Sequence, residues 1–220
     1  MLVIAGLLVW RLSVPGPAFT AIGGCNELLN ANVLAEIPGT EGAEVEGVDA
    51  ATSYVTPASV DTSCSVVTDN GWVESSVLQV SISRYSAATE QDDYVLPQQQ
   101  HDLLFRSPIE RALGDGATTG DGVEIEDGAG GVVIADVEIR DLSLGETGQA
   151  VDYSNVEIRD EYLDFEDPDD WAAASFTTRN VLVSLTYEGT PGMERGERLD
   201  AVTDAARLVK QYIEATGVTA

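Results

Sequence analysis

Acidic side chains are the most abundant groups in this sequence that could perform chemistry. The chain of 220 residues carries 38 aspartates and glutamates, and almost half of them lie between Asp115 and Asp170. The densest group immediately precedes Trp171 and consists of Asp164, Glu166, Asp167, Asp169 and Asp170. Calcium prefers such oxygen ligands, so these five residues are candidate metal ligands. Because no EF-hand pattern accompanies them, a solvated acidic loop is the favoured interpretation, with a calcium site as the alternative.

A pair of carboxylates could also serve a hydrolase of the glycosidase type, but acids this numerous make closeness in sequence uninformative. His101 is the only histidine, so any Ser-His-Asp or Cys-His site would have to use it. It follows three glutamines, no GxSxG nucleophile motif occurs, and we therefore predict a histidine at the surface. Neither a Walker loop nor a GxGxxG segment is present. These observations predict a protein that is not an enzyme and that uses no cofactor.

Cys25 and Cys64 are the two cysteines of the chain, and their spacing fits no zinc pattern. In an exported protein such a pair indicates one disulfide, which is the interpretation we favour. Two alternatives stay open. Residues 22–25 loosely match a lipobox, in which Cys25 would carry a lipid, although Pro15 and Pro17 separate it from the apolar N-terminus. In a cytosolic protein both cysteines would instead be free, buried thiols.

The formal net charge of −27 at pH 7 restricts the choice of partners. A chain this acidic repels phosphate backbones and anionic lipid head groups, so we do not expect it to bind nucleic acid. Solubility, or a salty or cation-rich exterior, is the simplest explanation of such a charge. Hydrophobic residues make up 44% of the chain, which is enough for a real core.

The chain opens with an apolar run over residues 2–9. Spanning a bilayer takes about 20 residues, so we interpret residues 1–14 as part of a membrane anchor or signal segment whose basic beginning lies upstream. A buried core strand is the alternative. Residues 15–24 would be a linker, leading to a single extracytoplasmic domain over residues 25–216. We accordingly expect the protein at the extracytoplasmic face of the cell membrane, held only by its N-terminal segment, or secreted.

Residues 174–188 give the clearest strand signal. Val181, Val183 and Leu185 recur with the period of two that a half-buried strand requires, and we predict one long strand here. From about Gly196, apolar residues recur every three or four positions, which predicts an amphipathic helix. A strand and a helix of this quality form the core of an α+β domain.

The N-terminal half gives weaker signals. A helical face is predicted over residues 28–37, followed by an exposed connection over residues 40–63. Two hairpin strands are predicted on either side of the turn at residues 69–71, which reads Asp-Asn-Gly. Residues 97–113 predict a short helix, interrupted near Pro108.

The glycine-rich and acidic residues 114–131 predict a loop inserted into the domain. A sequence Val-Glu-Ile-x-Asp begins at Val123 and recurs at Val137 and Val156. The spacings are too irregular for a solenoid, and each copy predicts a short strand instead.

Several segments together resemble a known family. They are CNELLNANVLAEI from Cys25, CSVV from Cys64, LGETGQA from Leu144, SFTTRNVLVSLTYEG from Ser175 and AVTDAARLVKQYI from Ala201. In these short motifs, over residues 24–216, the chain resembles a secreted or membrane-anchored actinobacterial lipoprotein family of unknown function. It is also similar to the extracytoplasmic sensor domains of some actinobacterial receptor kinases.

The resemblance implies an α+β fold, in which helices cover a curved antiparallel sheet broadly like those of PsbP and Mog1. Cys25 and Cys64 match the family's disulfide pair, and Asn180, Tyr187 and Gly189 match its strand motif. The family has no assigned activity, so the resemblance implies no catalytic residues.

Two departures from the family pattern stand out. Val66 occupies a position where the family usually has Trp, and the acidic insert over residues 115–131 is unusually long.

Three functions remain in competition. The leading hypothesis is a non-catalytic, membrane-anchored extracytoplasmic domain that binds an envelope component or a partner protein. The first alternative is a calcium-dependent binding or adhesion module that uses the acidic region 115–170. The second alternative is a hydrolase with a carboxylate pair.

Overall fold

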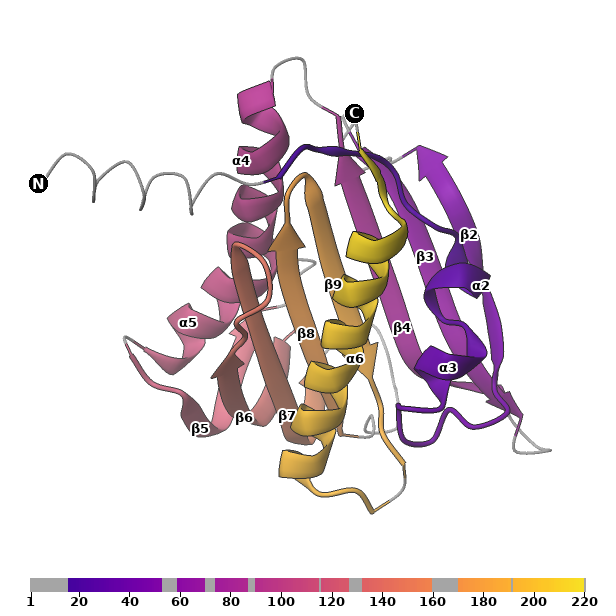
Figure 1. The fold of residues 1–220 in the computed structure, drawn as a ribbon. Helices are drawn as coiled ribbons and strands as arrows, with labels where there is room; N and C mark the ends of the chain where they lie inside the picture. Colours follow the sequence, from indigo (N-terminus) through magenta and orange to yellow (C-terminus); the bar gives the residue numbers. More distant parts are fainter. Residues whose placement is uncertain are drawn as a thin grey trace, which may run out of the picture.

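Eight segments with alternating apolar residues form one antiparallel sheet, which organises the fold (Figure 1). The computed structural model describes residues 16–52, 59–69, 74–86, 90–114, 116–126, 132–159, 170–190 and 192–219. The strands of the sheet are β2 (Glu44–Thr52), β3 (Ser59–Asp69), β4 (Glu74–Tyr85), β5 (Thr119–Glu126), β6 (Val132–Asp141), β7 (Thr147–Arg159), β8 (Trp171–Thr178) and β9 (Val181–Tyr187). Their spatial order is β2-β3-β4-β9-β8-β7-β6-β5. Two meanders, β2 to β4 and β5 to β9, are therefore joined by the pairing of β4 with β9.

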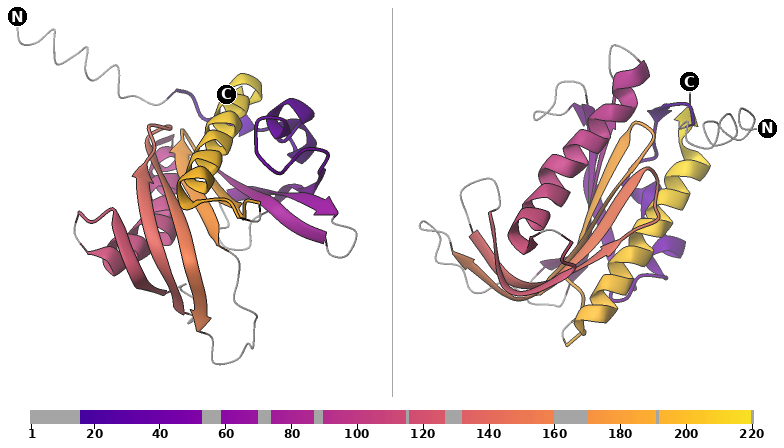
Figure 2. Two further views of the ribbon diagram at one scale, coloured as in Figure 1. Left: turned by 90° about the horizontal axis from the view of Figure 1, so that it is seen from below. Right: turned by 90° about the vertical axis from the view of Figure 1, so that its left-hand side faces the viewer.

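Helices cover both faces of this sheet, and the strands β5 to β7 curve around the helices on one face (Figure 2). That face carries a continuous helical segment consisting of α4 (Glu90–His101), the π-helical turn η1 (Asp102–Arg106) and α5 (Ser107–Leu113). The opposite face carries α2 (Cys25–Leu28), α3 (Ala31–Leu34) and the long helix α6 (Arg195–Thr216). The expected α+β fold, with a curved antiparallel sheet and covering helices, is confirmed. In the described part of the chain, no helix is long and apolar enough to cross a bilayer.

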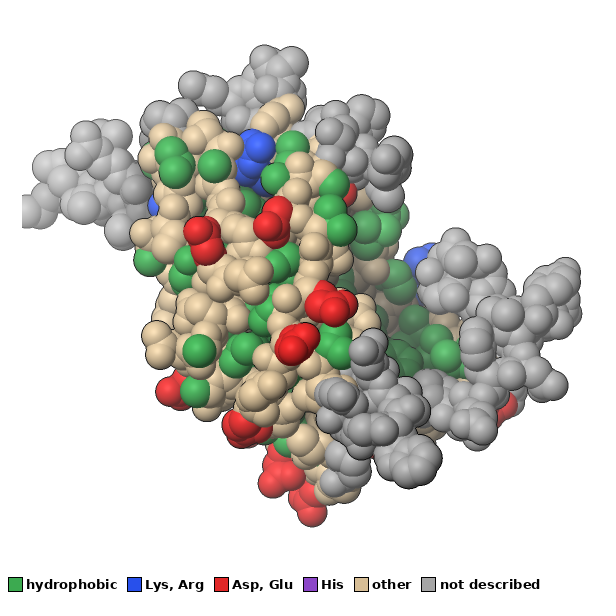
Figure 3. Space-filling view, turned by 90° about the vertical axis from the view of Figure 1, so that its right-hand side faces the viewer, with side chains coloured by type: hydrophobic (Ala, Val, Ile, Leu, Met, Phe, Trp, Pro, Cys, Tyr) green, Lys and Arg blue, Asp and Glu red, His purple; other side chains and the backbone are tan. Residues whose placement is uncertain are grey.

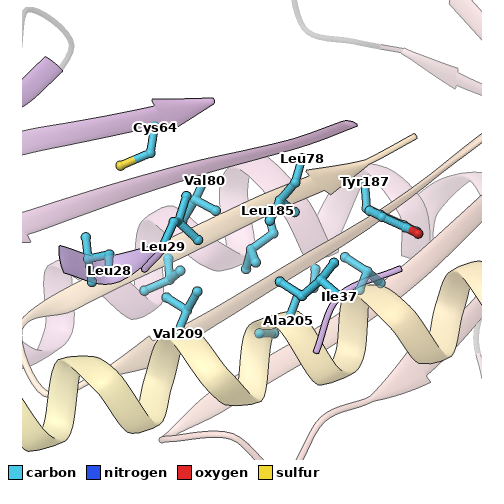
Figure 4. Packing of buried hydrophobic residues seen from close by; sticks show 14 of the residues in the cluster. Leu28, Leu29, Ile37, Cys64, Leu78, Val80, Leu185, Tyr187, Ala205 and Val209 are labelled. Carbon is cyan, nitrogen blue, oxygen red and sulfur yellow. The ribbon is translucent and has the colours of Figure 1, made fainter. Parts of the chain in front are cut away.

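The main core lies between the sheet and α6, as the α+β expectation requires (Figure 4). Val202 and Val209 of α6 are completely buried, and so are Val183 and Tyr187 of β9. The α6 helix begins with a reciprocal pair of hydrogen bonds: the backbone N–H of Glu194 donates to the side chain of Glu197 at 3.1 Å, and the side chain of Glu194 accepts from the backbone N–H of Glu197. Such a capping box satisfies amide groups that the first turn leaves open.

A short sheet joins the two ends of the described chain. Strand β1 (Phe19–Ala21) pairs with β10 (Val218–Thr219), and Phe19 lies opposite Thr219. Asn180 fixes β1 to the main sheet, because its amide exchanges hydrogen bonds with the backbone of Phe19 at 2.7 and 2.9 Å. The N-terminal segment is thus held against both α6 and the β8–β9 hairpin.

The prediction of one long strand from residue 174 is wrong. The segment forms a hairpin of β8 and β9, which turns at Arg179 and Asn180. Arg179 has a φ of 54°, a left-handed backbone that ends a ladder. Alternation on both sides of this turn concealed it, because two adjacent strands present the same period as one.

The predicted loop over residues 114–131 is corrected in part, because residues 119–126 form β5. The strand forms despite the neighbouring glycines, because the Val-Glu-Ile pattern places an apolar side chain on the inner face of the sheet. Ile125 is 7% exposed and packs in a small core under α5. Residues 127–131 lie outside the described chain. The predicted exposed connection over residues 40–63 is likewise wrong, since most of it belongs to β2 and β3.

Two predicted helices also differ from the structure. The predicted helical face over residues 28–37 is two single turns, α2 and α3, because α2 ends at its C-cap Leu29, whose backbone is not helical, and Asn30 caps α3. The helix predicted over residues 97–113 continues past Pro108, and the predicted interruption takes the form of the π-helical turn η1 just before this proline.

Candidate ligand-binding groove

A groove of 500 Å³ lies between the η1–α5 segment and the sheet. Its lining residues are contributed by one helical segment and five strands: Leu103, Leu104, Phe105, Pro108, Ile109, Arg111, Ile125, Val133, Tyr153, Trp171, Ala173, Ser184, Leu185 and Thr186. Figure 3, viewed from the side of β2, shows a recessed area in which hydrophobic side chains are visible. Pockets of this size with mostly apolar walls are typical of small-molecule sites.

Two aromatic rings form one wall of the groove. Tyr153 of β7 and Trp171 of β8 are cross-strand neighbours, and their ring centroids lie 5.0 Å apart in a stacked arrangement. Strand alternation places both rings on the α5 face, opposite the α6 core. Burial raises the pKa of the Tyr153 phenol, so the phenol is neutral at physiological pH. The wall therefore presents uncharged aromatic surface.

The outer rim of the groove is formed by two leucines that remain in contact with solvent. Leu103 and Leu104 belong to η1, and each is 62% exposed. The wider π-helical turn rotates consecutive residues relative to an α-helix, and such turns are frequent at functional sites. Large apolar side chains exposed beside an apolar hollow are typical of a binding surface.

The one histidine of the chain lies just before η1 and is not among the residues that line the groove. His101 is only 2% exposed, so the prediction of a surface histidine is wrong. Its Nε2–H donates to the backbone carbonyl of Ser175 at 3.3 Å, because a carbonyl can only accept. The Oγ of Ser175 lies instead 3.4 Å from Ser184 Oγ. His101 thus contacts the carbonyl of this serine and not its hydroxyl, an arrangement that does not activate Ser175 as a nucleophile.

Burial lowers the pKa of His101, while the bond to Ser175 and the nearby Asp102 carboxylate act in the opposite direction. In the described part of the chain, the Nδ1 atom of His101 has no hydrogen-bond partner, and Asp102 lies 3.6 Å away. A neutral ring with Nε2 protonated fits this environment. Three glutamines preceding the histidine concealed its burial, because they lie on more exposed faces of the helix, whereas His101 shares the inward face with the buried Pro97.

The five acidic residues proposed as metal ligands are described only in part. Asp164, Glu166, Asp167 and Asp169 lie outside the described residues. Asp170 accepts one hydrogen bond from the backbone N–H of Asn155 at 2.8 Å and forms an ion pair with Arg198 at 3.1 Å. Within the described ranges, no group of three or more His, Cys, Asp or Glu side chains could hold a metal ion. The calcium site therefore stays a prediction.

Asp170 belongs to a network of charges at the start of α6. Asp152 is completely buried and accepts two hydrogen bonds from Arg198, at 2.9 and 3.1 Å. Arg195 joins Asp152 to Asp136, at distances of 3.7 and 3.6 Å. Burial raises the pKa of Asp152, and the two guanidinium groups oppose that rise. The network links α6 to β6, β7 and β8, which gives these residues a structural role.

The residues that matched the strand motif of the lipoprotein family also have structural contacts. Asn180 holds β1, as described above. The hydroxyl of Tyr187 donates to the carbonyl of Pro38 at 2.9 Å, and burial raises the pKa of this phenol to about 12. Gly189 has a φ of 78° and lies against the side chain of Arg198. None of the three lines the groove.

Cys25 and Cys64 are joined by a disulfide that connects α2 to β3, with their Cα atoms 5.4 Å apart. The alternative of two free, buried thiols is therefore excluded in this structure. A lipid on Cys25 is also incompatible with it, because the sulfur atom of Cys25 is bonded to Cys64. Figure 4 shows Cys64 in the core near Leu28 and Leu29.

None of the groove residues is predicted from the sequence to belong to a binding site. The groove combines side chains that are distant in sequence, and only the topology of the sheet brings them together. One signal was available: Leu103, Leu104 and Phe105 are three consecutive apolar residues in a helix, more than one helical face can bury.

Comparison with known proteins gives a structural match and no significant match in sequence. No protein family matches the sequence, and no curated protein matches it significantly. One solved structure with a similar fold is the extracellular domain of PknH from Mycobacterium tuberculosis, at a TM-score of 0.49 and 10% identity. The match covers 91% of this chain and 100% of that chain. Membership of the lipoprotein family named above stays a prediction.

Proposed function

We propose that this chain is a non-catalytic, extracytoplasmic binding domain whose groove under α5 binds an apolar component of the cell envelope, such as an acyl chain. The observation that carries the proposal is the apolar groove itself, with its stacked aromatic wall and its two exposed leucines. A volume of 500 Å³ suits a chain-like small molecule better than a helix of a partner protein.

Two further observations support the proposed location and the proposed kind of partner. The disulfide favours an oxidising compartment, because cytosolic reductants keep thiols reduced. A net charge of −27 disfavours nucleic acid and anionic surfaces as partners. Anchoring through residues 1–14 belongs to the proposal, and those residues lie outside the described chain.

The burial and the hydrogen bonding of the single histidine support the proposal that the chain is not catalytic. His101 is neutral, buried and bonded to a backbone carbonyl, so it is committed to packing α4 on β8. The groove walls offer apolar contact and few polar groups, which favours binding over bond cleavage.

The test is binding of a neutral apolar fluorescent probe, N-phenylnaphthylamine, to the folded chain, followed by displacement with hexadecanoic acid. We expect saturable probe binding that the fatty acid displaces. Ala173, 9% exposed in the groove wall, offers a variant that fills the site. Ala173→Phe should abolish probe binding, and a circular dichroism spectrum should show that the variant stays folded.

A matched pair of surface variants keeps the test decisive if Ala173→Phe fails to fold. Leu104 is 62% exposed at the groove, and Val48 is 60% exposed on the edge strand β2, away from it. Leu104→Gln should weaken probe binding at least several-fold, while Val48→Gln should leave it unchanged. Equal effects of the two substitutions, or no displaceable binding, would overturn the proposal.

A further inference from the structure

A second cavity, of 360 Å³, lies on another face of α5 and is not part of the apolar groove. Its lining residues come from the helix, the following loop and the adjoining ends of β6 and β7: Arg106, Glu110, Gly114, Gly116, Ala117, Thr118, Ile139, Asp141 and Gln149. Arg106, Glu110 and Gly114 are four residues apart and form one ridge of the helix. The apolar groove uses Pro108 and Arg111 from the other side of the same helix.

Gln149 is the residue that gives this cavity a chemical preference. Its side chain is 94% buried, since the residue is 6% exposed, and it lines the cavity from the start of β7. In the part of the chain that the structure describes, its Oε1 atom has no hydrogen-bond partner. The Oε1 atom itself has almost no accessible surface, so Gln149 meets the cavity with the rest of its side chain, and the unsatisfied acceptor is a cost to stability.

The walls around Gln149 are held in place before any ligand arrives. The amide of Ile139 donates to the carbonyl of Thr118 at 2.8 Å, which ties the loop to β6. The amide of Gly114 donates to Glu110 at 3.0 Å and closes the end of α5. Arg106 and Glu110 form an ion pair of 2.6 Å along the helix, although both side chains are half exposed. A site with fixed polar groups loses little freedom on binding.

The donor and acceptor groups of this cavity are mixed. Glu110 and Asp141 only accept hydrogen bonds, Arg106 only donates, and the Gln149 amide can do both. A hydroxyl group also donates and accepts, so a ligand with several neighbouring hydroxyls matches this set. We propose that the cavity binds a neutral, hydroxyl-rich ligand of the saccharide class, whose hydroxyls contact the accessible part of the Gln149 side chain together with Arg106 and Asp141.

Charge argues against the other polar classes of ligand. One arginine and two carboxylates give the lining a formal charge of −1, in a chain of −27, so anions are repelled. A bare cation would want several converging oxygens, but Glu110 is already paired with Arg106. A neutral ligand avoids both difficulties.

The test is saturation-transfer difference NMR on the folded chain with three probes, glucose, arabinose and N-acetylglucosamine. At least one should receive saturation, and Gln149→Leu should reduce its affinity about tenfold, as the loss of one hydrogen bond predicts. Gln99 is an exposed glutamine of α4 outside the cavity, so Gln99→Leu is the matched control and should bind like the parent. Gln149→Leu should also melt at the same or a higher temperature, because it removes an unsatisfied buried acceptor.

Two results would overturn the proposal. If no probe gives more saturation with the parent than with Gln149→Leu, water fills the cavity. If Gln149→Leu melts well below the parent while Gln99→Leu does not, the amide has a structural role instead. Neither result depends on the apolar groove, since the probes carry no acyl chain and Leu104→Gln should leave saccharide binding unchanged.

Discussion

At the scale of single residues, Gly47 shows how closely the disulfide lies on the sheet. A Cβ atom at this position would be 2.2 Å from the carbonyl oxygen of Ser63 and 2.6 Å from Cys25 Sγ. Ser63 and Cys64 face this part of β2 across the ladder. Only glycine leaves room for the disulfide to pack directly over the strand.

We therefore expect Gly47→Ala to lower the free energy of unfolding by about 1 to 3 kcal/mol, because backbone and sulfur must both shift. Gly196 is the matched control: it is helical, and a Cβ atom there meets nothing within 4 Å. Gly196→Ala should stabilise the protein by about 0.5 kcal/mol. Urea titrations of both variants provide the measurement, and equal midpoints would show that Gly47 is not constrained.

His101 gives a prediction about pH. Its pKa is lowered in the folded chain, so between that value and the ordinary 6.5 the unfolded chain binds more protons. The neutral ring therefore contributes fully to the free energy of unfolding above pH 6.5. This contribution is lost as the pH falls from 6.5 to the lowered pKa of the folded chain. The free energy of unfolding should thus decline less on acidification in His101→Gln than in the parent. Titrations between about pH 7 and about pH 5 test this in the window around the histidine's ordinary pKa; parallel curves would contradict it.

At the scale of elements, α6 is the main cover of the sheet. Val202 and Val209 are 0% exposed, whereas Asp204 is exposed and forms an ion pair with Arg207. The apolar stripe predicted from residue 196 onward therefore faces the core as expected. A helix of this kind can be recognised from sequence because its period is local.

Three substitutions in α6 should rank in a fixed order. Val209→Asp buries a carboxylate without a partner and should prevent stable folding. Val202→Ala should cost about 1 to 3 kcal/mol through lost burial and a partial cavity. Asp204→Asn should change stability by no more than about 0.5 kcal/mol. Denaturant titrations check the order, and equal stability of Val209→Asp and Asp204→Asn would refute the packing of α6.

The charge network at the start of α6 could not be predicted from sequence, because its members come from four separate elements. Removing one side chain of the buried ion pair should lower stability more than replacing both side chains. Asp152→Ala leaves the buried guanidinium of Arg198 with less compensation and should cost about 3 to 5 kcal/mol. In the double variant Asp152→Leu/Arg198→Met we expect most of this loss to be recovered. A thermal-unfolding cycle measures the difference, and additive losses would contradict the coupling.

At the scale of the whole molecule, a net charge of −27 opposes compaction. Raising sodium chloride from about 0.01 M to about 1 M shortens the screening length from about 30 Å to about 3 Å, so the melting temperature should rise. Potassium chloride should act equally. Calcium chloride at the same ionic strength should add nothing if only screening is involved, and a larger shift reversed by chelator would support the calcium alternative.

Fold class and the major helix follow from local period, but the binding sites do not. The groove joins Leu104 to Trp171 and the second cavity joins Arg106 to Gln149, pairs that only the strand order brings together. The prediction of a surface position for His101 is wrong for the same reason. The burial of this side chain depends on a contact with Ser175 of β8, which is 74 residues away in the sequence.

The disulfide also determines how tension would pass through the molecule. A pull on the chain before Phe19 would first separate β1 from Asn180 and β10, and then reach Cys25. From there the covalent bond transmits the pull directly to Cys64 in β3, across a separation of 39 residues. The intervening segment, with α2, α3 and β2, is bypassed and stays unstretched. An N-terminal tether would therefore peel only a few residues before the sheet itself resists.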